Sequence, residues 1–268
     1  MKDALLWFAL VVLLVVIGFA IFYQVREPGD QPVPEGVVQP AEPAPVVPEP
    51  VDEPLHPVPE PVASEEPAIP LLPIDESDAA TRQSLSDAFG AESVAQFLVP
   101  ESVIRHIVAT VDNLPREELS DELRPVKATP GRFQVSGSEE APTLDPANYA
   151  RYDALVQLLD STDTAQIAAL YFQLYPLFQQ AYVELGYPDQ YFNDRLVEVI
   201  DHLLATPEIE GPIRLTRPKV LYQYADENIE ERSAGQKLLI RIGPANAAVA
   251  KAKLREIRSE VSGQRPAP

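Results

Sequence analysis

The sequence has no cysteine among its 268 residues. Without thiols the chain forms no disulfide, no zinc site with cysteine ligands, no cysteine-linked lipid anchor and no cysteine nucleophile. The folded part must therefore be stabilised by an ordinary hydrophobic core. The absence of cysteine does not distinguish a reducing from an oxidising compartment.

Basic residues are also scarce, because 21 Lys and Arg stand against 41 Asp and Glu, for a formal net charge of −20. Nucleic acid and anionic lipid surfaces bind basic proteins, so we expect no nucleic-acid partner. Motifs for a catalytic serine elbow, a zinc protease, a P-loop and a dinucleotide fold are all missing. We expect no cofactor, and no catalytic motif assigns a reaction.

What the sequence does contain begins with an apolar stretch at residues 4–23, ALLWFALVVLLVVIGFAIFY. At ~1.5 Å rise per residue it matches the ~30 Å hydrocarbon layer of a membrane. Trp7 and Tyr23 lie near its two ends, where aromatic rings favour the headgroup region. We predict a transmembrane anchor over residues 1–23. The alternative is a cleaved signal peptide with a site at Gly18-Phe19-Ala20, but the apolar run continues past that site.

Few charges flank this segment, and they bear on its orientation. Lys2 and the α-amino group lie on one side and Arg26 on the other. This count slightly favours the N-terminus in the cytoplasm. The soluble part would then lie outside the cytoplasm, in the periplasm if the cell has two membranes. An adaptor of the same build that faces the cytoplasm is the alternative.

Residues 24–73 carry more than half of the 29 prolines, with VPEPV repeats at 47–51 and 58–62. Proline fixes φ and removes hydrogen-bond donors, so this acidic segment is predicted to be a disordered, extended linker of polyproline type. We interpret it as a spacer between the membrane and the domain. A proline-rich docking ligand for an aromatic-lined groove is the alternative.

Residues 74–262 are predicted to form one mainly α domain, resembling a helical bundle, with at most a small β element, followed by a disordered tail at 263–268. Helix caps, glycine stops and helical spacing of apolar residues carry this prediction. Helices are expected at 75–89, 92–99, 100–111, 145–159, 164–185, 188–205, 226–233, 238–242 and 244–261. Short strands are expected at 133–135, 213–215 and 220–224, with 114–143 otherwise irregular.

Two long stretches carry a family resemblance: YVELGYPDQYFNDRLVEVIDHLLATP at 182–207 and GPIRLTRPKVLYQYADENIEERSAGQKLLIRIGP at 211–244. They resemble a bacterial family known as domain of unknown function 3014, and residues 109–114 and 144–161 are similar to it too. The resemblance implies a Gram-negative source and a domain that is often paired with an N-terminal membrane segment. The resemblance assigns no activity, because none is established for the family. Together with the predicted anchor, it leads us to expect a single-pass protein of the bacterial inner membrane.

One candidate metal site lies on the helix expected at 188–205. Residues four and eight apart share one side of a helix, and carboxylates with an imidazole can hold a divalent ion. The bland alternative is an ordinary solvated helix face, in which Glu198 pairs with Arg195 and His202. The candidate ligands are Asp194, Glu198, Asp201 and His202.

A candidate ligand site follows in the basic run Arg214, Arg217 and Lys219, which stands out in an acidic domain. A strand-like segment there would present alternate side chains on one face, where they could bind an anionic group. Internal ion pairs with surplus carboxylates are the alternative. Tyr187, from a tyrosine-rich stretch, is added because tyrosine is frequent at binding surfaces.

An anchor, a long spacer and a compact domain together hold a binding surface at a distance from a membrane. We therefore expect a tethered interaction or scaffold module of the cell envelope, with a protein or cell-wall partner. The alternative is a periplasmic enzyme, or a receptor for a small ligand or metal, that uses residues 194–219.

Overall fold

The computed structural model describes residues 53–59, 73–128, 131–218 and 221–263. The prediction of a mainly α domain with a small β element is confirmed over these ranges. None of the helices within them is long and apolar enough to cross a membrane. The predicted anchor, and most of the predicted linker, lie outside the described residues.

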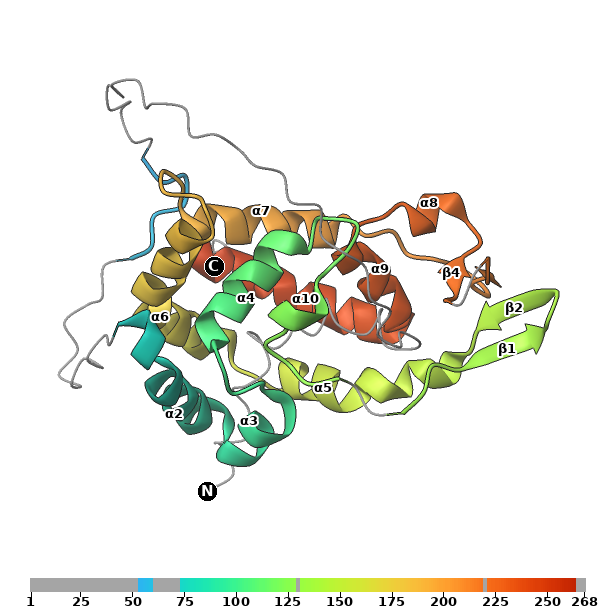
Figure 1. The fold of residues 1–268 in the computed structure, drawn as a ribbon, viewed down its shortest axis with the longest axis horizontal. Coiled ribbons are helices and arrows are strands. Elements are labelled where there is room, and N and C mark those ends of the chain that lie inside the picture. The colour runs from blue at the N-terminus through green and yellow to red at the C-terminus, as the bar shows by residue number, and fades with distance from the viewer. Residues whose placement is uncertain (1–52, 60–72, 129–130, 219–220, 264–268) are drawn as a thin grey trace, which may run out of the picture.

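The helices follow the chain in the predicted order (Figure 1). Their bounds are α2 Asp78–Phe89, α3 Ala91–Phe97, α4 Val103–Asn113, α5 Ala150–Asp160, α6 Thr164–Glu184, α7 Phe192–Leu204, α8 Glu227–Glu230, α9 Ala234–Arg241 and α10 Pro244–Val261. Short 3-10 turns cover η1 Ile74–Glu76, η2 Asp121–Leu123 and η3 Pro146–Asn148.

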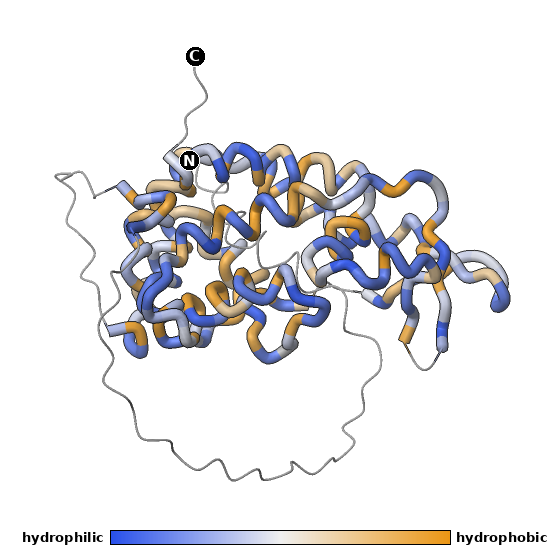
Figure 2. The backbone as a smooth tube through the Cα atoms, turned by 90° about the horizontal axis from the view of Figure 1, so that it is seen from above, coloured by the Kyte–Doolittle hydropathy of each residue, from blue (hydrophilic) through white to orange (hydrophobic). Residues whose placement is uncertain are grey.

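The core lies between α4, α6, α7 and α10, with α5 and α9 packed along α10. Figure 2 shows hydrophobic and hydrophilic residues interspersed along the helices of the domain. In α10, Ala250, Leu254, Ile257 and Val261 follow one another in steps of three and four residues, and all four are buried. The last helix therefore docks on its own domain.

Two lysines of α10 are buried. Lys251 and Lys253 are each only 7% exposed. Lys251 Nζ donates to the carbonyl oxygen of Thr206, and Lys253 Nζ donates to that of Thr162 at 2.9 Å. Both carbonyls lie just beyond a helix end, where the backbone lacks a helical donor. These lysines thus connect α10 to the ends of α7 and α5.

Helix α4 begins at Val103, three residues after the proline that was expected in its first turn. Ser102 has a positive φ of 49°, which turns the chain away from the helix. The carboxylate of Asp78 accepts the backbone N–H groups of Ser102 and Val103 at 2.6 and 2.9 Å. A side chain from another helix therefore caps α4, and local sequence does not reveal such a cap.

The β structure consists of two short hairpins. Strand β1 (Val135–Ser138) pairs with β2 (Ala141–Leu144), and β3 (Leu215–Thr216) pairs with β4 (Gln223–Tyr224). Strand β1 begins two residues later than predicted from sequence. The reason is that the side chain of Asn148 bonds both backbone groups of Gln134. Its Oδ1 accepts the N–H at 2.9 Å, and its Nδ2 donates to the carbonyl oxygen at 2.7 Å. The hairpins cover a second apolar cluster of Leu144, Ile213, Leu215, Tyr224, Ile229 and Ile240.

Gly243 joins α9 to α10 at a φ of +88°, and a Cβ atom there would lie 2.5 Å from the ring of Tyr149. Gly243→Ala is expected to lower the free energy of unfolding by about 2–5 kcal/mol, from the left-handed backbone and the overpacking together. Gly211→Ala is the matched control, because its φ is +78° with nothing within 4 Å. It should cost only about 1–2 kcal/mol in chemical denaturation. Equal losses would show that the Tyr149 contact is not tight.

Candidate functional site

Helix α7 carries the residues predicted as metal ligands, and the structure gives each a different partner. Asp194 accepts backbone N–H groups, Glu198 pairs with Arg195, Asp201 pairs with Arg258, and His202 bonds Ser233. Within the described residues no group of three or more His, Cys, Asp or Glu side chains is placed to hold a metal ion. The predicted pairing of Glu198 with Arg195 is present at 2.8 Å, whereas His202 does not join it.

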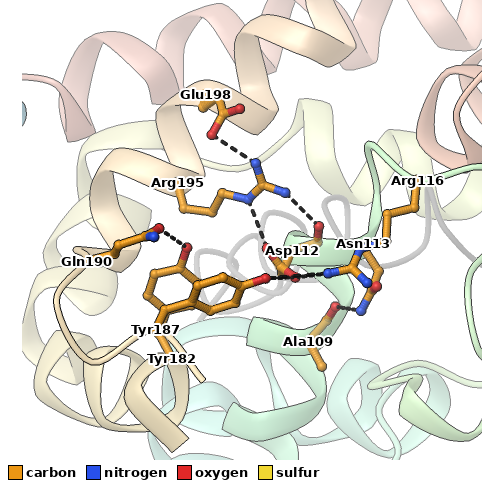
Figure 3. A network of polar contacts seen from close by, with 9 residues as sticks. All are labelled: Ala109, Asp112, Asn113, Arg116, Tyr182, Tyr187, Gln190, Arg195 and Glu198. Carbon is orange, nitrogen blue, oxygen red and sulfur yellow. Dashed lines mark hydrogen bonds and ion pairs between the residues drawn. The ribbon is translucent and has the colours of Figure 1, made fainter. Parts of the chain in front are cut away.

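The most buried charge on this side of the domain is Asp112 of α4, which is 2% exposed (Figure 3). Its carboxylate accepts Arg195 Nε at 3.0 Å and Arg116 Nη2 at 2.8 Å, and its carbonyl accepts Arg195 Nη2 at 2.9 Å. The hydroxyl of Tyr187 donates to the same carboxylate at 3.2 Å. Asp112 therefore joins α4 to α7 and to the α6–α7 connection.

Two tyrosines cover this network. The rings of Tyr182 and Tyr187 are stacked with centroids 4.6 Å apart, as Figure 3 shows. Burial raises the pKa of Tyr182 to about 12, and the charge of Asp112 acts in the same direction. The hydroxyl of Tyr182 therefore stays protonated at neutral pH, and it donates to Gln190 Oε1 at 3.3 Å. Tyr187, which was predicted as a ligand-binding residue, is thus part of the Asp112 network through its hydroxyl.

The basic run lies at the other end of the molecule, around β3 and β4 (Figure 1). Arg214 is exposed, and its carbonyl oxygen accepts the N–H of Ala225 at 3.0 Å. The guanidinium of Arg217 lies 5.3 Å from the ring centroid of Tyr222. Lys219 lies outside the described residues. The fold thus separates Tyr187 from the arginines with which it was grouped.

The C-terminal half of α7 is held to α9 through His202. Its Nε2 lies 2.8 Å from Ser233 Oγ, and its carbonyl oxygen accepts Gln236 Nε2 at 3.0 Å. Burial lowers the pKa of His202, and the charge of Arg195 lowers it further. Burial also lowers the pKa of His106 in α4. Both rings therefore take up a proton at a lower pH in the folded domain than in the unfolded chain.

These two histidines predict a loss of stability in mild acid. The unfolded chain takes up protons near pH ~6.5, before the folded one does, so the free energy of unfolding is constant above that pH and falls below it. Each histidine contributes a slope of at most ~1.4 kcal/mol per pH unit. Carboxylates with lowered pKa, such as Glu184 and Glu256, act only in stronger acid.

Urea denaturation at pH 7.5 and pH 5.5 measures this slope. His202→Gln keeps a hydrogen bond to Ser233 within reach and should make the slope shallower, and the double variant with His106→Gln should remove most of it. An unchanged slope in the double variant would contradict the assignment to histidine.

At the N-terminal end of α7, residues 53–59 of the predicted linker lie against the domain; we refer to them as the clasp segment. The carboxylate of Asp194 accepts the backbone N–H of Leu55 at 3.0 Å and that of His56 at 2.7 Å. Asn193 Nδ2 donates to the carbonyl oxygen of His56 at 2.8 Å. A segment more than 130 residues away in sequence is thus bound through its backbone.

Asn193 is 0% exposed and is fixed by contacts on two further sides. Its Oδ1 accepts the hydroxyl of Tyr171 at 3.0 Å, and its Nδ2 also donates to the carbonyl oxygen of Val261 at 2.9 Å. Neighbouring Tyr175 has its pKa raised to about 12, mainly by burial. The clasp site is therefore built jointly by α6, α7 and the end of α10.

A cavity of about 580 Å³ lies beyond the other end of α7, and residues of both apolar clusters line it. Apolar side chains such as Leu144, Ile213 and Leu239 make up much of its wall, and Lys251 also lines it. Its size suits a small ligand. The ammonium group of Lys251 is already bonded to the carbonyl oxygen of Thr206.

Neither the Asp112 network nor the clasp site is among the sites predicted from the sequence. Asp112 follows three apolar residues of the α4 core face within one turn, and such an acid beside a buried stripe is the one signal that could have revealed it. The clasp segment has no side-chain pattern that predicts its docking, because the domain binds its backbone groups.

A family model described as "Protein of unknown function (DUF3014)" matches residues 103–258, which is more than half of the chain and includes Asp112, Asn193 and Asp194. No curated protein and no solved structure matches the chain. The chain belongs to the DUF3014 family.

Proposed function

We propose that this protein is a membrane-tethered interaction or scaffold module of the bacterial envelope. In this proposal residues 1–23 anchor the chain in the inner membrane, and the proline-rich linker holds the helical domain in the periplasm. The domain then presents a binding surface to a protein or cell-wall partner. Tethering raises the effective concentration of the domain near the membrane and so supplements a modest affinity.

The observation that supports a binding role is the docked clasp segment. The domain holds this piece of chain, which lies outside its helical fold, through Asn193 and Asp194. Main-chain hydrogen bonds to an extended peptide are a common basis of protein recognition. The surrounding scaffold is rigid, because Asn193 is buried and Asp112 ties α7 to α4.

In-cell photo-crosslinking of the full chain tests the proposal. A photoreactive residue at Asp189, which is exposed in the α6–α7 connection, should form adducts with a defined partner. The control position is Glu139, exposed in the β1–β2 turn at the opposite end of the domain (Figure 1). The proposal fails if Asp189 yields no adduct, or the same adducts as Glu139.

A second candidate function, a receptor for a small ligand, is favoured by the cavity of about 580 Å³, whose wall includes residues 206–209 and 211–213. Its apolar lining suits the body of a small amphipathic molecule. Thermal shift of the full chain with a panel of such molecules tests it. A shift that Ala248→Trp abolishes would support this role, and no shift across the panel would count against it.

A further inference from the structure

We propose that the Asn193–Asp194 surface recognises Pro-x-x-Pro segments by their two adjacent backbone N–H groups, and that residues 54–57, Pro-Leu-His-Pro, occupy it within this chain. The inference rests on the proposed role as an interaction module and names the chemistry of its partner. That partner is a peptide with two non-proline residues between prolines, bent at those two residues.

The contacts show that the site binds the backbone of the clasp segment. The side chain of Leu55 is 82% exposed although its N–H is bound by Asp194. Pro54, His56 and Val58 are half-buried, and the residues between them are exposed. The segment bends at Leu55 and His56, which directs two successive N–H groups to one carboxylate. In a straight extended chain successive N–H groups point in different directions.

The spacing of the prolines follows from this geometry. Proline has no N–H, so a Pro-x-Pro segment offers only one donor between its prolines, whereas Pro-x-x-Pro offers two. The flanking prolines also restrict the backbone of the peptide before it binds, which lowers the entropy cost of docking. Pro54 and Pro57 frame the two bound donors in this way.

The same domain uses this type of contact a second time. The Asp78 carboxylate accepts the adjacent N–H groups of Ser102 and Val103 at 2.6 and 2.9 Å, close to the 3.0 and 2.7 Å at Asp194. Hydrogen bonds to an ionised acceptor are about twice as strong as neutral ones. At Asp78 the contact fixes a helix start, and at Asp194 it holds the clasp segment.

The clasp site adds what Asp78 lacks, a fixed donor for the carbonyl oxygen that follows the two N–H groups. Asn193 Nδ2 supplies it to His56, and Tyr171 holds the same amide from behind. Two acceptors and one donor in a fixed row match the sequence of groups along Pro-x-x-Pro. The linker repeats this pattern at 40–43, 45–48, 67–70 and 70–73, so the matching peptide class is abundant in the chain itself.

A spin label on the full chain in detergent tests occupancy of the site. The chain has no cysteine, so Leu55→Cys gives a single attachment point that keeps the backbone N–H. The label should be ordered, and Asp194→Ala should make it mobile. Asp201→Ala is the matched control on the same helix, because this carboxylate pairs with Arg258 and should leave the label ordered. An ordered label in Asp194→Ala would overturn the inference.

Recognition of the second N–H is tested at residue 56 of the labelled chain. His56→Ala keeps the N–H and should leave the label ordered, whereas His56→Pro removes it and should release the label. A label that is equally ordered in the two variants would show that the site does not recognise the N–H of residue 56.

Free peptides then test the partner chemistry on the same labelled chain. A tethered segment has an effective concentration near millimolar, so the peptide EPLHPVP is titrated into that range. It should release the label at a concentration at least about tenfold lower than EPLPPVP, which lacks one of the two charge-assisted hydrogen bonds. Equal action of the two peptides, or no release by either, would overturn the inference. These results do not depend on whether photo-crosslinking finds a partner, so the two proposals can fail separately.

Discussion

Asp112→Ala is expected to lower the free energy of unfolding by about 3–5 kcal/mol, the range for breaking a buried ion pair by removing one partner. Asp112 is 2% exposed and neutralises Arg195, whose side chain is 20% exposed. Among the residues that the structure describes, the substitution leaves that guanidinium with only the exposed Glu198 as a counter-ion. It also leaves the hydroxyl of Tyr187 without its acceptor.

The control for this prediction is Asp201→Ala, which removes an ion pair of similar geometry from the surface. The side chains of Arg258 and Asp201 are 30% and 49% exposed. Solvent screens such a pair, and its loss should cost no more than about 1 kcal/mol. Urea denaturation of both variants at pH 7.5 measures the difference. Similar losses would mean that Asp112 is not the buried anchor of α4 and α7.

Asn193→Ala is the second substitution with a large expected effect, about 2–5 kcal/mol. It leaves the hydroxyl of Tyr171 and the carbonyl oxygen of Val261 without partners in a buried region. Each buried polar group left unsatisfied costs about 1–3 kcal/mol. The variant should also release the clasp segment, because the donor to His56 is lost.

Asn246→Ala provides the matched control. Asn246 Nδ2 also has several acceptors, among them the carbonyl oxygen of Ile242 at 3.1 Å and Asp153 Oδ1 at 3.0 Å. Asn246 is only half-buried. Water can therefore replace the lost donor. The expected loss is therefore no more than about 1.5 kcal/mol. An equal loss in the two variants would contradict the special position of Asn193.

Much of the helical fold was predictable because its signals are local. Gly90 ends α2 and Pro244 opens α10, as the sequence indicates. The apolar stripe of α7 likewise fixed which of its faces is buried. Such signals act within one or two turns of a helix, so a single sequence is enough to read them.

The β hairpins were predicted less well, because their bounds depend on distant side chains. The side chain of Asn148 is hydrogen-bonded to the backbone of Gln134. Thr143 of β2 forms an isolated β-bridge with Arg214, next to β3. Strands this short have little propensity of their own, and tertiary contacts decide where pairing starts.

The polar contacts of the candidate site were the least predictable part. Asp112 and Arg195 are 83 residues apart in the chain, and each is an ordinary charged residue of an amphipathic helix in the sequence. The clasp contact is harder still, since every non-proline residue has the N–H group that Asp194 binds. Only the spacing of prolines around Leu55 and His56 distinguishes it, and that spacing recurs along the linker.

Amide hydrogen exchange at Leu55 and His56 in the full-length protein is the most direct measurement of the central claim, that the domain binds a segment of its own linker. Both N–H groups are bound to Asp194, so their exchange should be slowed well below the rate of an unstructured peptide, and Asp194→Ala should restore that rate. Exchange at the unstructured rate in the wild-type chain would contradict the account.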